Sequence, residues 1–372
     1  MARLKEYNGH YCESEYEYAF IGFLETEGWK YTSGNKLSRV TKRDVLIEDD
    51  FKKFIAVGNP DLTEDEVTQI YDTVRLVGAE SDFATLHKVY NWLVDGIQFT
   101  PKDGIARMIP LINFEKDGVK NIFRVVNQFT VEYTNNGQKE NRRPDVILFV
   151  NGMPLCIMEL KNPADVNATI YDAWEQINIR YWRDIPHLLH YCPLACISDG
   201  VKTRLGTVRT PYEHFYAWRR VTERDAVSTL PFAETETMIK GVYAPERFLE
   251  IFRDYIYFQD SIYDSDEVEI VCRYPQFFAA RLLKQSIIKS VVEKSGKGGT
   301  YFGATGCGKT YTMAFLARQL ALRCIDIPEI GSPTIILIVD RDELQKQGSK
   351  LFTKSKEFLN LGEVSVVKNR TQ

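Results

Sequence analysis

The sequence of 372 residues lacks a strong excess of either charge, since 47 lysine and arginine residues stand against 51 aspartate and glutamate residues. The net charge of −4 gives no overall attraction to a polyanion, so any contact with nucleic acid must come from local basic patches. A solvated surface with ordinary charge scatter explains such patches almost as well. The two candidate patches are Lys139, Arg142 and Arg143, and Lys202, Arg204 and Arg209.

Long hydrophobic runs are also missing. The longest ones, such as 335–339, have the length of a strand and fall far short of the ~20 residues that span a bilayer. The first five residues, MARLK, lack the apolar core of a signal peptide. The seven cysteines are an odd number spread thinly over the chain, which argues against a disulfide framework and for reduced thiols. We therefore expect a cytoplasmic protein that does not contact a membrane.

The sequence has enough apolar material for two or three domains, with 44% hydrophobic and 12% aromatic residues. In the first 215 residues, the apolar periodicity predicts helices and strands around a mixed sheet, with Asp61 or Thr63 as a helix cap. The predicted helices cover 13–27, 61–95 and 164–183, and the predicted strands cover 119–123, 129–133, 146–150 and 194–197.

The periodic pattern fades over 216–240 and resumes after it. Helices are predicted over 245–258, 277–292 and 309–323, with a short strand before the last of them and another over 334–339. This order of strand, glycine-rich loop, helix and strand predicts a parallel α/β unit. We expect an α/β protein with a first domain over 1–220, a linker over 221–245 and a second domain over 246–372.

Three ionisable side chains stand at the ends of a predicted hairpin. Asn151-Gly152 is a strong turn signal, and pairing across it brings Asp145 opposite the end of the strand that carries Glu159 and Lys161. Glu159 and Lys161 point the same way, because alternate residues of a strand share a face. Two carboxylates can hold a divalent cation against a phosphodiester, and an ammonium can act beside the attacking water.

A routine Glu/Lys pair on a surface hairpin is the alternative explanation. The flanking runs 146–150 and 155–158 favour the functional one, because they are continuously apolar, as in strands that are buried on both faces. Charged side chains at the ends of buried strands are less easily explained as ordinary solvent-exposed surface residues.

These residues resemble the PD-(D/E)xK nuclease domain of the motor (R) subunits of type I restriction enzymes. The resemblance rests on Arg143-Pro144-Asp145, on Asn151-Gly152 followed by Pro154, and on the segment from Glu159 to Pro163. It implies that Asp145 and Glu159 bind Mg²⁺ and that Lys161 orients or activates the hydrolytic water.

The resemblance also implies three supporting residues. Glu17 matches the acidic residue of the family's first helix, although Glu13 and Glu15 compete for that position. Gln176 and Tyr181 correspond to a Gln-x-x-x-Tyr motif on the helix after the nuclease strands. In this chain they are five residues apart, one more than the motif has.

The second half contains a phosphate-binding loop of the pattern G-x-x-x-x-G-K-[ST], with a helix predicted after it. Glycines let backbone N–H groups turn toward phosphates, Lys309 reaches the β and γ oxygens, and Thr310 offers a hydroxyl to Mg²⁺. The loop predicts ATP binding, and an accidental match in a flexible loop is the alternative. Its residues are Gly303, Ala304, Thr305, Gly306, Cys307, Gly308, Lys309 and Thr310.

Two segments around this loop resemble motifs of superfamily 2 helicase-like motors, which implies a RecA-like domain. Gln276 would hydrogen-bond the adenine edge with Tyr274 stacking on it, and the segment 340–344 would contact the DNA backbone. The alternatives without a functional role are the start of a helix for Tyr274 and Gln276, and a turn between a strand and a helix for 340–344. No Asp-Glu-x-His box follows before Gln372, so we expect the N-terminal part of a longer protein, which hydrolyses ATP poorly as it stands.

The resemblance thus predicts the restriction subunit of a type I restriction-modification enzyme. In the complete enzyme, Mg²⁺-dependent cleavage of double-stranded DNA would be coupled to ATP-driven translocation, with methyltransferase and specificity subunits as partners. Two alternatives remain open: another nuclease-helicase such as a repair enzyme, or a DNA-binding ATPase whose inactive nuclease fold serves as a docking module.

Overall fold

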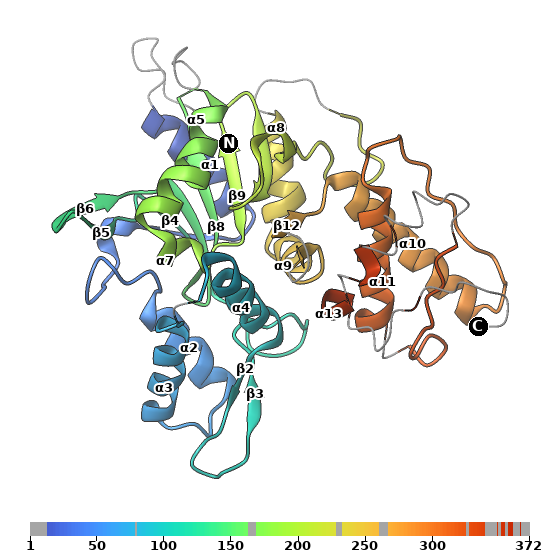
Figure 1. The fold of residues 1–372 in the computed structure, drawn as a ribbon, viewed down its shortest axis with the longest axis horizontal. Coiled ribbons are helices and arrows are strands. Elements are labelled where there is room, and N and C mark those ends of the chain that lie inside the picture. Colours follow the sequence, from blue (N-terminus) through green and yellow to red (C-terminus); the bar gives the residue numbers. More distant parts are fainter. Residues whose placement is uncertain are drawn as a thin grey trace. The chain divides into compact units, whose positions relative to one another are not determined.

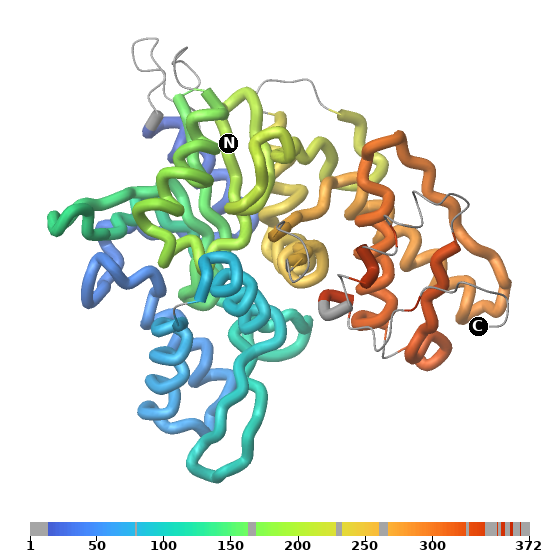
Figure 2. The backbone as a smooth tube through the Cα atoms, in the orientation of Figure 1, coloured from blue at the N-terminus to red at the C-terminus, as the bar shows by residue number. Residues whose placement is uncertain are grey.

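The computed structural model describes 13–78, 80–162, 169–227, 233–259, 267–324 and 327–338, together with 348, 351–353, 356–359 and 365. The chain divides into two compact units, one that ends at Arg253 and one that begins at Asp254. Figure 1 labels their helices and strands, and Figure 2 follows the backbone. Within the described ranges, the structure contains no helix with both the length and the apolarity to cross a membrane.

The first unit is built on a six-stranded mixed sheet with the order β1-β4-β7-β8-β9-β10. The pairs β1/β4 and β8/β9 are parallel, and the other three pairs are antiparallel. This confirms the predicted mixed central sheet. The strands are β1 (Lys30–Ser33), β4 (Phe123–Asn127), β7 (Val146–Val150), β8 (Met153–Leu160), β9 (Leu194–Ser198) and β10 (Thr203–Thr207).

The central strands β7 and β8 are buried at every position, as their continuous apolar runs predicted. Opposite faces of β8 meet different helices, since Cys156 lies beside Tyr243 while Glu159 contacts Tyr181. The covering helical segments are α1 (Glu13–Thr26), α5 (Ile170–Glu175), η2 (Gln176–Tyr181), α6 (Trp182–Asp184), α7 (Pro186–Leu189), α8 (Ala233–Met238), η4 (Ile239–Tyr243) and α9 (Pro245–Asp254).

A helical lobe follows β1 in the chain and stands below the sheet in Figure 1. The predicted helix over 61–95 is two helices, because 76–81 interrupt it. Thr63 caps the first of the two with a full capping box, as predicted. The lobe contains α2 (Glu48–Gly58), α3 (Glu64–Arg75), α4 (Asp82–Asp95), and the antiparallel pair β2 (Ile97–Phe99) and β3 (Arg107–Ile109).

A second antiparallel hairpin, β5 (Val131–Asn135) with β6 (Gln138–Arg142), is inserted between β4 and β7. It replaces the predicted strand over 129–133, and the strand predicted over 119–123 lies later, at β4. Both shifts have the same cause: the polar and glycine residues between the apolar runs form the turns, and strand ends follow hydrogen-bond pairing rather than apolarity.

The second unit contains two long helices, α10 (Tyr274–Val292) and α11 (Lys309–Arg323), that pack on each other, and the short α13 (Lys356–Leu359). The predicted helices over 277–292 and 309–323 are confirmed. The predicted helix over 245–258 ends earlier, at Asp254, because β11 (Ile256–Gln259) pairs with β12 (Val268–Val271) as an antiparallel ribbon.

The predicted parallel α/β unit does not occur in the described part of the second unit. Residues 297–304 and 333–338 have no regular structure, and Val339 lies outside the described residues. Phe302, Ile336 and Ile338 are 94%, 78% and 88% exposed, so these apolar runs have no neighbouring strands or covering helices. A parallel strand requires both.

The predicted domain limits stay a prediction. Residues 233–253 belong to the first unit, so the division between the units falls after the predicted linker over 221–245.

Candidate active site

The candidate site depends first on the register of the β7–β8 hairpin. Asn151-Gly152 forms the predicted turn, with positive φ angles of 52° and 78°. Next to the turn, Val150 pairs with Met153. If this register continued unchanged, Met158 would stand opposite Asp145. Glu159 would then face the other side of the sheet.

A β-bulge corrects this register. The pairing shifts by one residue between Leu148 and Phe149, where Pro154 lies on the opposite strand. Proline lacks the amide hydrogen that an interior strand needs for its ladder, so it is tolerated at bulges. The shift brings Glu159 opposite Asp145 on the same face of the sheet. The turn signal predicted this pairing, whereas the bulge on which the pairing depends was not predicted, although Pro154 was a signal for it.

The two carboxyl groups lie side by side and influence each other. Asp145 accepts the Leu160 N–H at Oδ2 (2.8 Å), and Glu159 has no exposed surface. Burial raises the pKa of Asp145, and burial followed by the Asp145 charge raises the pKa of Glu159 well above its ordinary value. Without a cation, the pair therefore holds one proton, on Glu159.

A closed circuit of polar contacts surrounds Glu159. Lys161 Nζ donates to Gln176 Oε1 (2.9 Å), Gln176 Nε2 donates to the Tyr181 hydroxyl (2.8 Å), and Tyr181 donates to Glu159 Oε1 (2.6 Å). Lys161 Nζ also lies 3.9 Å from Glu159 Oε2. That oxygen is buried and has no hydrogen-bond partner in the described part of the chain. The ionised form of Glu159 is costly with such an oxygen, so Glu159 keeps its proton until a cation takes the place of the missing donor.

The five-residue spacing of Gln176 and Tyr181 is explained by a π-helix. The segment η2 starts at Gln176 and ends at Tyr181. In an α-helix, residues five apart differ by about 140° around the axis, whereas the i→i+5 pattern of a π-helix places them on one face. The extra residue in this chain is thus absorbed locally, and both side chains reach Glu159 and Lys161. The spacing was the only sequence signal for this π-helix.

Glu17 stands at the same end of the sheet. Its Oε1 accepts from Asn127 Nδ2 (2.5 Å) and its Oε2 from Gln128 Nε2 (2.6 Å). Glu17 is 5% exposed and lines a pocket of ≈ 530 Å³ together with Asp145 and Arg143. Asn127 is the last residue of β4 and Gln128 follows it. Neither was predicted as a site residue, because a single amide pair in the sequence gave no signal. Among the described residues, no three His, Cys, Asp or Glu side chains come close enough together to hold a metal ion.

The two predicted basic patches differ. In the second patch, Arg204 lies over the ring of Tyr212 and Arg209 over those of Phe83 and Trp182. These guanidinium groups are therefore engaged by aromatic rings, and only Lys202 of that patch is fully exposed.

In the first patch, Arg142 differs from Lys139 and Arg143 because it forms an ion pair within the protein. It forms an ion pair with Asp184 at 2.6 Å. Lys139 and Arg143 are exposed, and the Arg143 charge acts on Asp145, whose pKa it lowers.

The phosphate-binding loop precedes α11 as predicted. Gly306 and Gly308 have φ angles of 79° and 78°, which is the conformation that glycine permits without strain. Lys309 is the first residue of α11, and its Nζ donates to the carbonyls of Gly303 (2.8 Å) and Ala304 (3.0 Å). These carbonyls hold the ammonium over the loop, where an incoming phosphate would compete for it. Thr305 is exposed, while Cys307 and Thr310 are half-buried.

Gln276 is placed against the phosphate loop. Its Nε2 donates to the carbonyls of Cys307 (3.3 Å) and Gly308 (3.2 Å), and its Oε1 accepts the Arg273 N–H (2.8 Å). The amide thus joins the start of α10 to the start of α11, with Tyr274 beside it as the first residue of α10. The segment 340–344, predicted to contact DNA, lies outside the described residues.

Comparison with known proteins gives two family matches. Residues 11–214 match the family described as type I restriction enzyme R protein N terminus. Residues 275–371 match the SWI2/SNF2 ATPase family. The first match contains every residue of the carboxylate site, and the second contains the phosphate-binding loop.

Two similar proteins cover nearly the whole chain. A protein of Methanocaldococcus jannaschii, described as the type I restriction enzyme MjaIXP endonuclease subunit, is 30% identical over 91% of this chain and 34% of its own length. The type I restriction enzyme HindI endonuclease subunit of Haemophilus influenzae is 29% identical over 93% of this chain and 33% of its own length. The chain therefore spans about a third of the length of these curated relatives.

Proposed function

Because the chain belongs to the type I restriction enzyme R protein N-terminus family, we propose that its first unit is a PD-(D/E)xK nuclease that cleaves double-stranded DNA. The observation that supports this most is the circuit around Glu159, which leaves one buried carboxylate oxygen without a hydrogen-bond donor beside a second carboxylate. Such an arrangement destabilises the fold unless a cation completes it, and the relatives are named as endonuclease subunits.

The residues present fit Mg²⁺. Asp145 and Glu159 supply the one or two carboxylates by which proteins usually hold this ion, with water and phosphate oxygens as its other ligands. When bound, Mg²⁺ would supply a lowered pKa for an attacking water and charge neutralisation at the scissile phosphate.

The other residues of the circuit have positioning roles in this proposal. Gln176 holds the Lys161 ammonium at the site, where it can orient a water or stabilise negative charge on the phosphate. Tyr181 fixes Glu159 Oε1, so that Oε2 is the oxygen presented to the metal. Glu17 holds the amides of Asn127 and Gln128 on the far wall of the pocket, where its role is to shape the entry beside Asp145.

For the second unit we propose ATP binding by a RecA-like motor domain. The match to the SWI2/SNF2 ATPase family and the loop from Gly303 to Thr310 support this. Lys309 would exchange its two carbonyl partners for the phosphates, Thr310 would offer its hydroxyl to Mg²⁺, and Gln276 with Tyr274 would meet the adenine. In the longer protein, ATP hydrolysis would drive translocation along DNA.

The proposed partners are double-stranded DNA and the methyltransferase and specificity subunits of a type I complex, since the relatives are named as subunits of such enzymes. The proposed location is the cytoplasm. The described cysteines are all free thiols, which suits a reducing compartment.

The variant Lys161→Ala tests this proposal in the full-length protein assembled with its partner subunits. We expect DNA cleavage to fall by on the order of 10²- to 10³-fold, the usual loss when one electrostatic group is removed from an active site. ATPase activity should be unchanged. Lys53→Ala, which removes an exposed lysine of the same unit outside both candidate basic patches, is the matched control. Persistence of cleavage, or loss of ATPase activity with it, would sink the assignment, and an inert but DNA-binding wild type would favour the docking module.

A further inference from the structure

The β5–β6 hairpin, called the arm below, grows out of the candidate active site. Its first residue, Val131, follows Gln128 by three positions, and its last residue, Arg142, precedes Asp145 by three. Both Gln128 and Asp145 line the same pocket. The arm extends away from the sheet in Figures 1 and 2. The chain thus leaves the pocket wall at Gln128, runs through the arm and returns to the wall at Arg143.

The outer part of the arm has the chemistry of a groove-binding element. All six residues of 134–139 are exposed, and their side chains are hydroxyl, amide and ammonium groups with one glycine. None of the exposed large hydrophobic residues of the described chain lies in the arm. Asparagine and glutamine amides can donate to and accept from base edges at once, and lysine can bind phosphate or guanine. A protein-docking surface would instead be expected to offer aromatic or aliphatic anchors.

The arm is held in one shape by its inner face. The Tyr133 hydroxyl donates to Glu140 Oε2 (2.5 Å), and Asn135 Nδ2 donates to Glu140 Oε1 (2.8 Å). Arg142 lies over the Tyr133 ring at 5.3 Å and also pairs with Asp184. The Glu140 carboxylate is thus turned toward protein groups, and the ribbon is preorganised before any ligand arrives.

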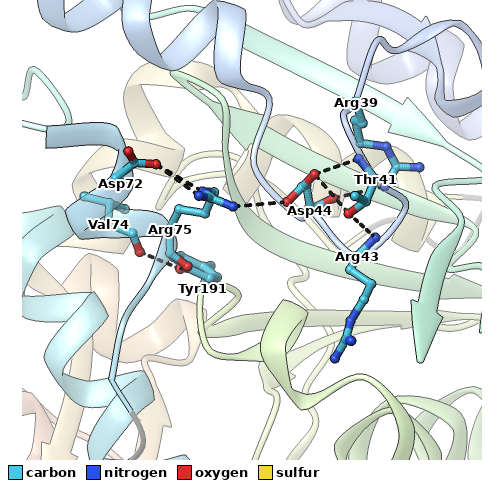
Figure 3. A network of polar contacts seen from close by, with 8 residues as sticks. All are labelled: Arg39, Thr41, Arg43, Asp44, Asp72, Val74, Arg75 and Tyr191. Carbon is cyan, nitrogen blue, oxygen red and sulfur yellow. Dashed lines mark hydrogen bonds and ion pairs between the residues drawn. The ribbon is translucent and has the colours of Figure 1, made fainter. Parts of the chain in front are cut away.

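A second basic segment, 39–44, is fastened to the base of the arm. The Glu132 N–H donates to the Lys42 carbonyl (3.0 Å), and Arg39 Nη2 donates to the Thr130 carbonyl (2.8 Å). Figure 3 shows how Asp44 holds this segment through Thr41 and Arg75, while the Arg43 side chain points away from these carboxylates. The segment is fixed, and its outward cation is free to bind.

Four cations border the arm. Lys42, Arg43 and Lys139 are exposed, while Arg143 lines the pocket with Asp145, and its charge lowers the pKa of that carboxyl. The helical lobe has the opposite character, since 48–95 carry eleven acidic and four basic residues. A polyanion is therefore drawn to the side of the arm and repelled from the lobe.

We propose that the arm enters the major groove of duplex DNA next to the phosphate held at Asp145, with the four cations on the flanking phosphates. This rests on the proposed nuclease function and adds how the duplex is held. The major groove, ≈ 12 Å wide, admits a two-stranded ribbon. Five residues per strand reach about 17 Å, or roughly five base pairs beyond the scissile phosphate.

The test measures duplex binding separately from cleavage. All variants carry Lys161→Ala in the full chain, so that DNA is not consumed, and fluorescence anisotropy follows a labelled duplex over a salt series. One variant lacks the pairs Thr134/Lys139 and Asn135/Gln138, which shortens the arm but keeps its Asn-Gly turn. A second variant, with Gln138, Lys139 and Asn141 changed to alanine, keeps the whole ribbon and covers the case in which shortening unfolds the protein. Lys53→Ala on the acidic lobe is the charge-matched control.

We expect both arm variants to bind at least about tenfold more weakly, and the Lys53→Ala control to bind like the parent. Loss of Lys139 should also reduce the slope of log K against log salt by about one. A duplex with bulky glucosyl groups on cytosine C5, which project into the major groove, should bind the parent as weakly as plain DNA binds the shortened arm.

Arm variants that bind as tightly as the parent would overturn the proposal, as would a parent that does not bind duplex DNA. Full binding of the glucosylated duplex would equally rule out the major groove. Capture of a protein partner lost only in the arm variants, with DNA binding intact, would assign the arm to that partner instead. A different result would overturn the nuclease proposal. In that case, the chain with Lys161 intact would bind duplex DNA through the arm but would not cleave it.

Discussion

The carboxylate site and the phosphate-binding loop are assembled in contrasting ways. The carboxylate site draws on residues 17 to 181, which a six-stranded sheet and two helical segments bring together. The phosphate loop uses eight consecutive residues from Gly303 to Thr310 and needs only the start of α11 to take its shape. Glu159 is fully buried, whereas Lys309 is exposed.

This difference decides how each site responds to change. In the buried site, the ionised carboxylate of Glu159 lacks a hydrogen-bond donor and is stable only beside a cation. The residue that would bind the metal therefore lowers the stability of the metal-free fold. In the exposed loop, water screens the charge of Lys309, so this charge contributes little to the free energy of unfolding. A substitution there can abolish function with little effect on folding. The predictions below test this contrast.

The largest effect is expected for Glu159→Gln. Cleavage should fall by on the order of 10³-fold, because the site loses a metal ligand. The fold should nevertheless become more stable at neutral pH without divalent ions, with melting rising by about 2–4 °C per kcal/mol gained. Thermal unfolding with and without Mg²⁺ checks this, since Mg²⁺ should raise the melting temperature of the wild type and leave the variant unchanged.

The pH dependence follows from the raised pKa of Glu159. Below its ordinary value of 4.5, the carboxyl is protonated in both the folded and the unfolded chain and costs nothing. As the pH rises toward the raised folded pKa, only the unfolded chain releases the proton freely, so stability falls. Relative to Glu159→Gln, the metal-free wild type should lose stability steadily as the pH rises above about 4.5. An unchanged difference over that range would contradict the burial argument.

A smaller effect is expected for Lys309→Ala in the phosphate loop. Loss of one charge-assisted contact to phosphate should weaken ATP binding by roughly 10- to 100-fold. The melting temperature of the nucleotide-free protein should stay the same, in contrast to Glu159→Gln. Isothermal titration with a non-hydrolysable ATP analogue measures the affinity, and Lys297→Ala, upstream of the loop, is the control. A large loss of stability would show that the loop is not the independent element described above.

The smallest effect is expected for Tyr181→Phe. The lost hydrogen bond to Glu159 should reduce cleavage roughly tenfold, which corresponds to ~1.4 kcal/mol. Because the Tyr181 hydroxyl lowers the pKa of Glu159, its removal should also shift the acid limb of the pH–rate profile to higher pH. Tyr191→Phe is the matched control, since that buried hydroxyl donates to the Val74 carbonyl away from the site (Figure 3). An equal loss in both variants would indicate a structural effect alone.

Much of the fold and both sites could be predicted from local sequence signals. Continuous apolar runs predicted β7, β8 and β9, and Asn151-Gly152 predicted the turn between the first two. The glycine pattern and the following helical period predicted the phosphate loop and α11. These signals suffice because turns and helix starts are fixed by a few adjacent residues.

The features that the sequence did not reveal depend on long-range pairing. The bulge at Pro154 and the π-helix from Gln176 each absorb one extra residue. The bulge returns Glu159 to the face of the sheet that carries Asp145, and the π-helix places Tyr181 on the same helix face as Gln176. Periodicity in a single sequence cannot detect an inserted residue of this kind. The second unit shows the converse error: the apolar run 335–338 predicted a strand, but apolarity without a neighbouring strand gave no ladder.

The most direct test of the central claim is to soak crystals of the chain with Mn²⁺ and record its anomalous scattering. We expect a Mn²⁺ ion between the Asp145 and Glu159 carboxylates, close to the oxygen of Glu159 that lacks a donor, and no such ion in Glu159→Gln. Wild-type crystals with no anomalous peak at these carboxylates would rule out this metal site and leave the first unit as a docking module.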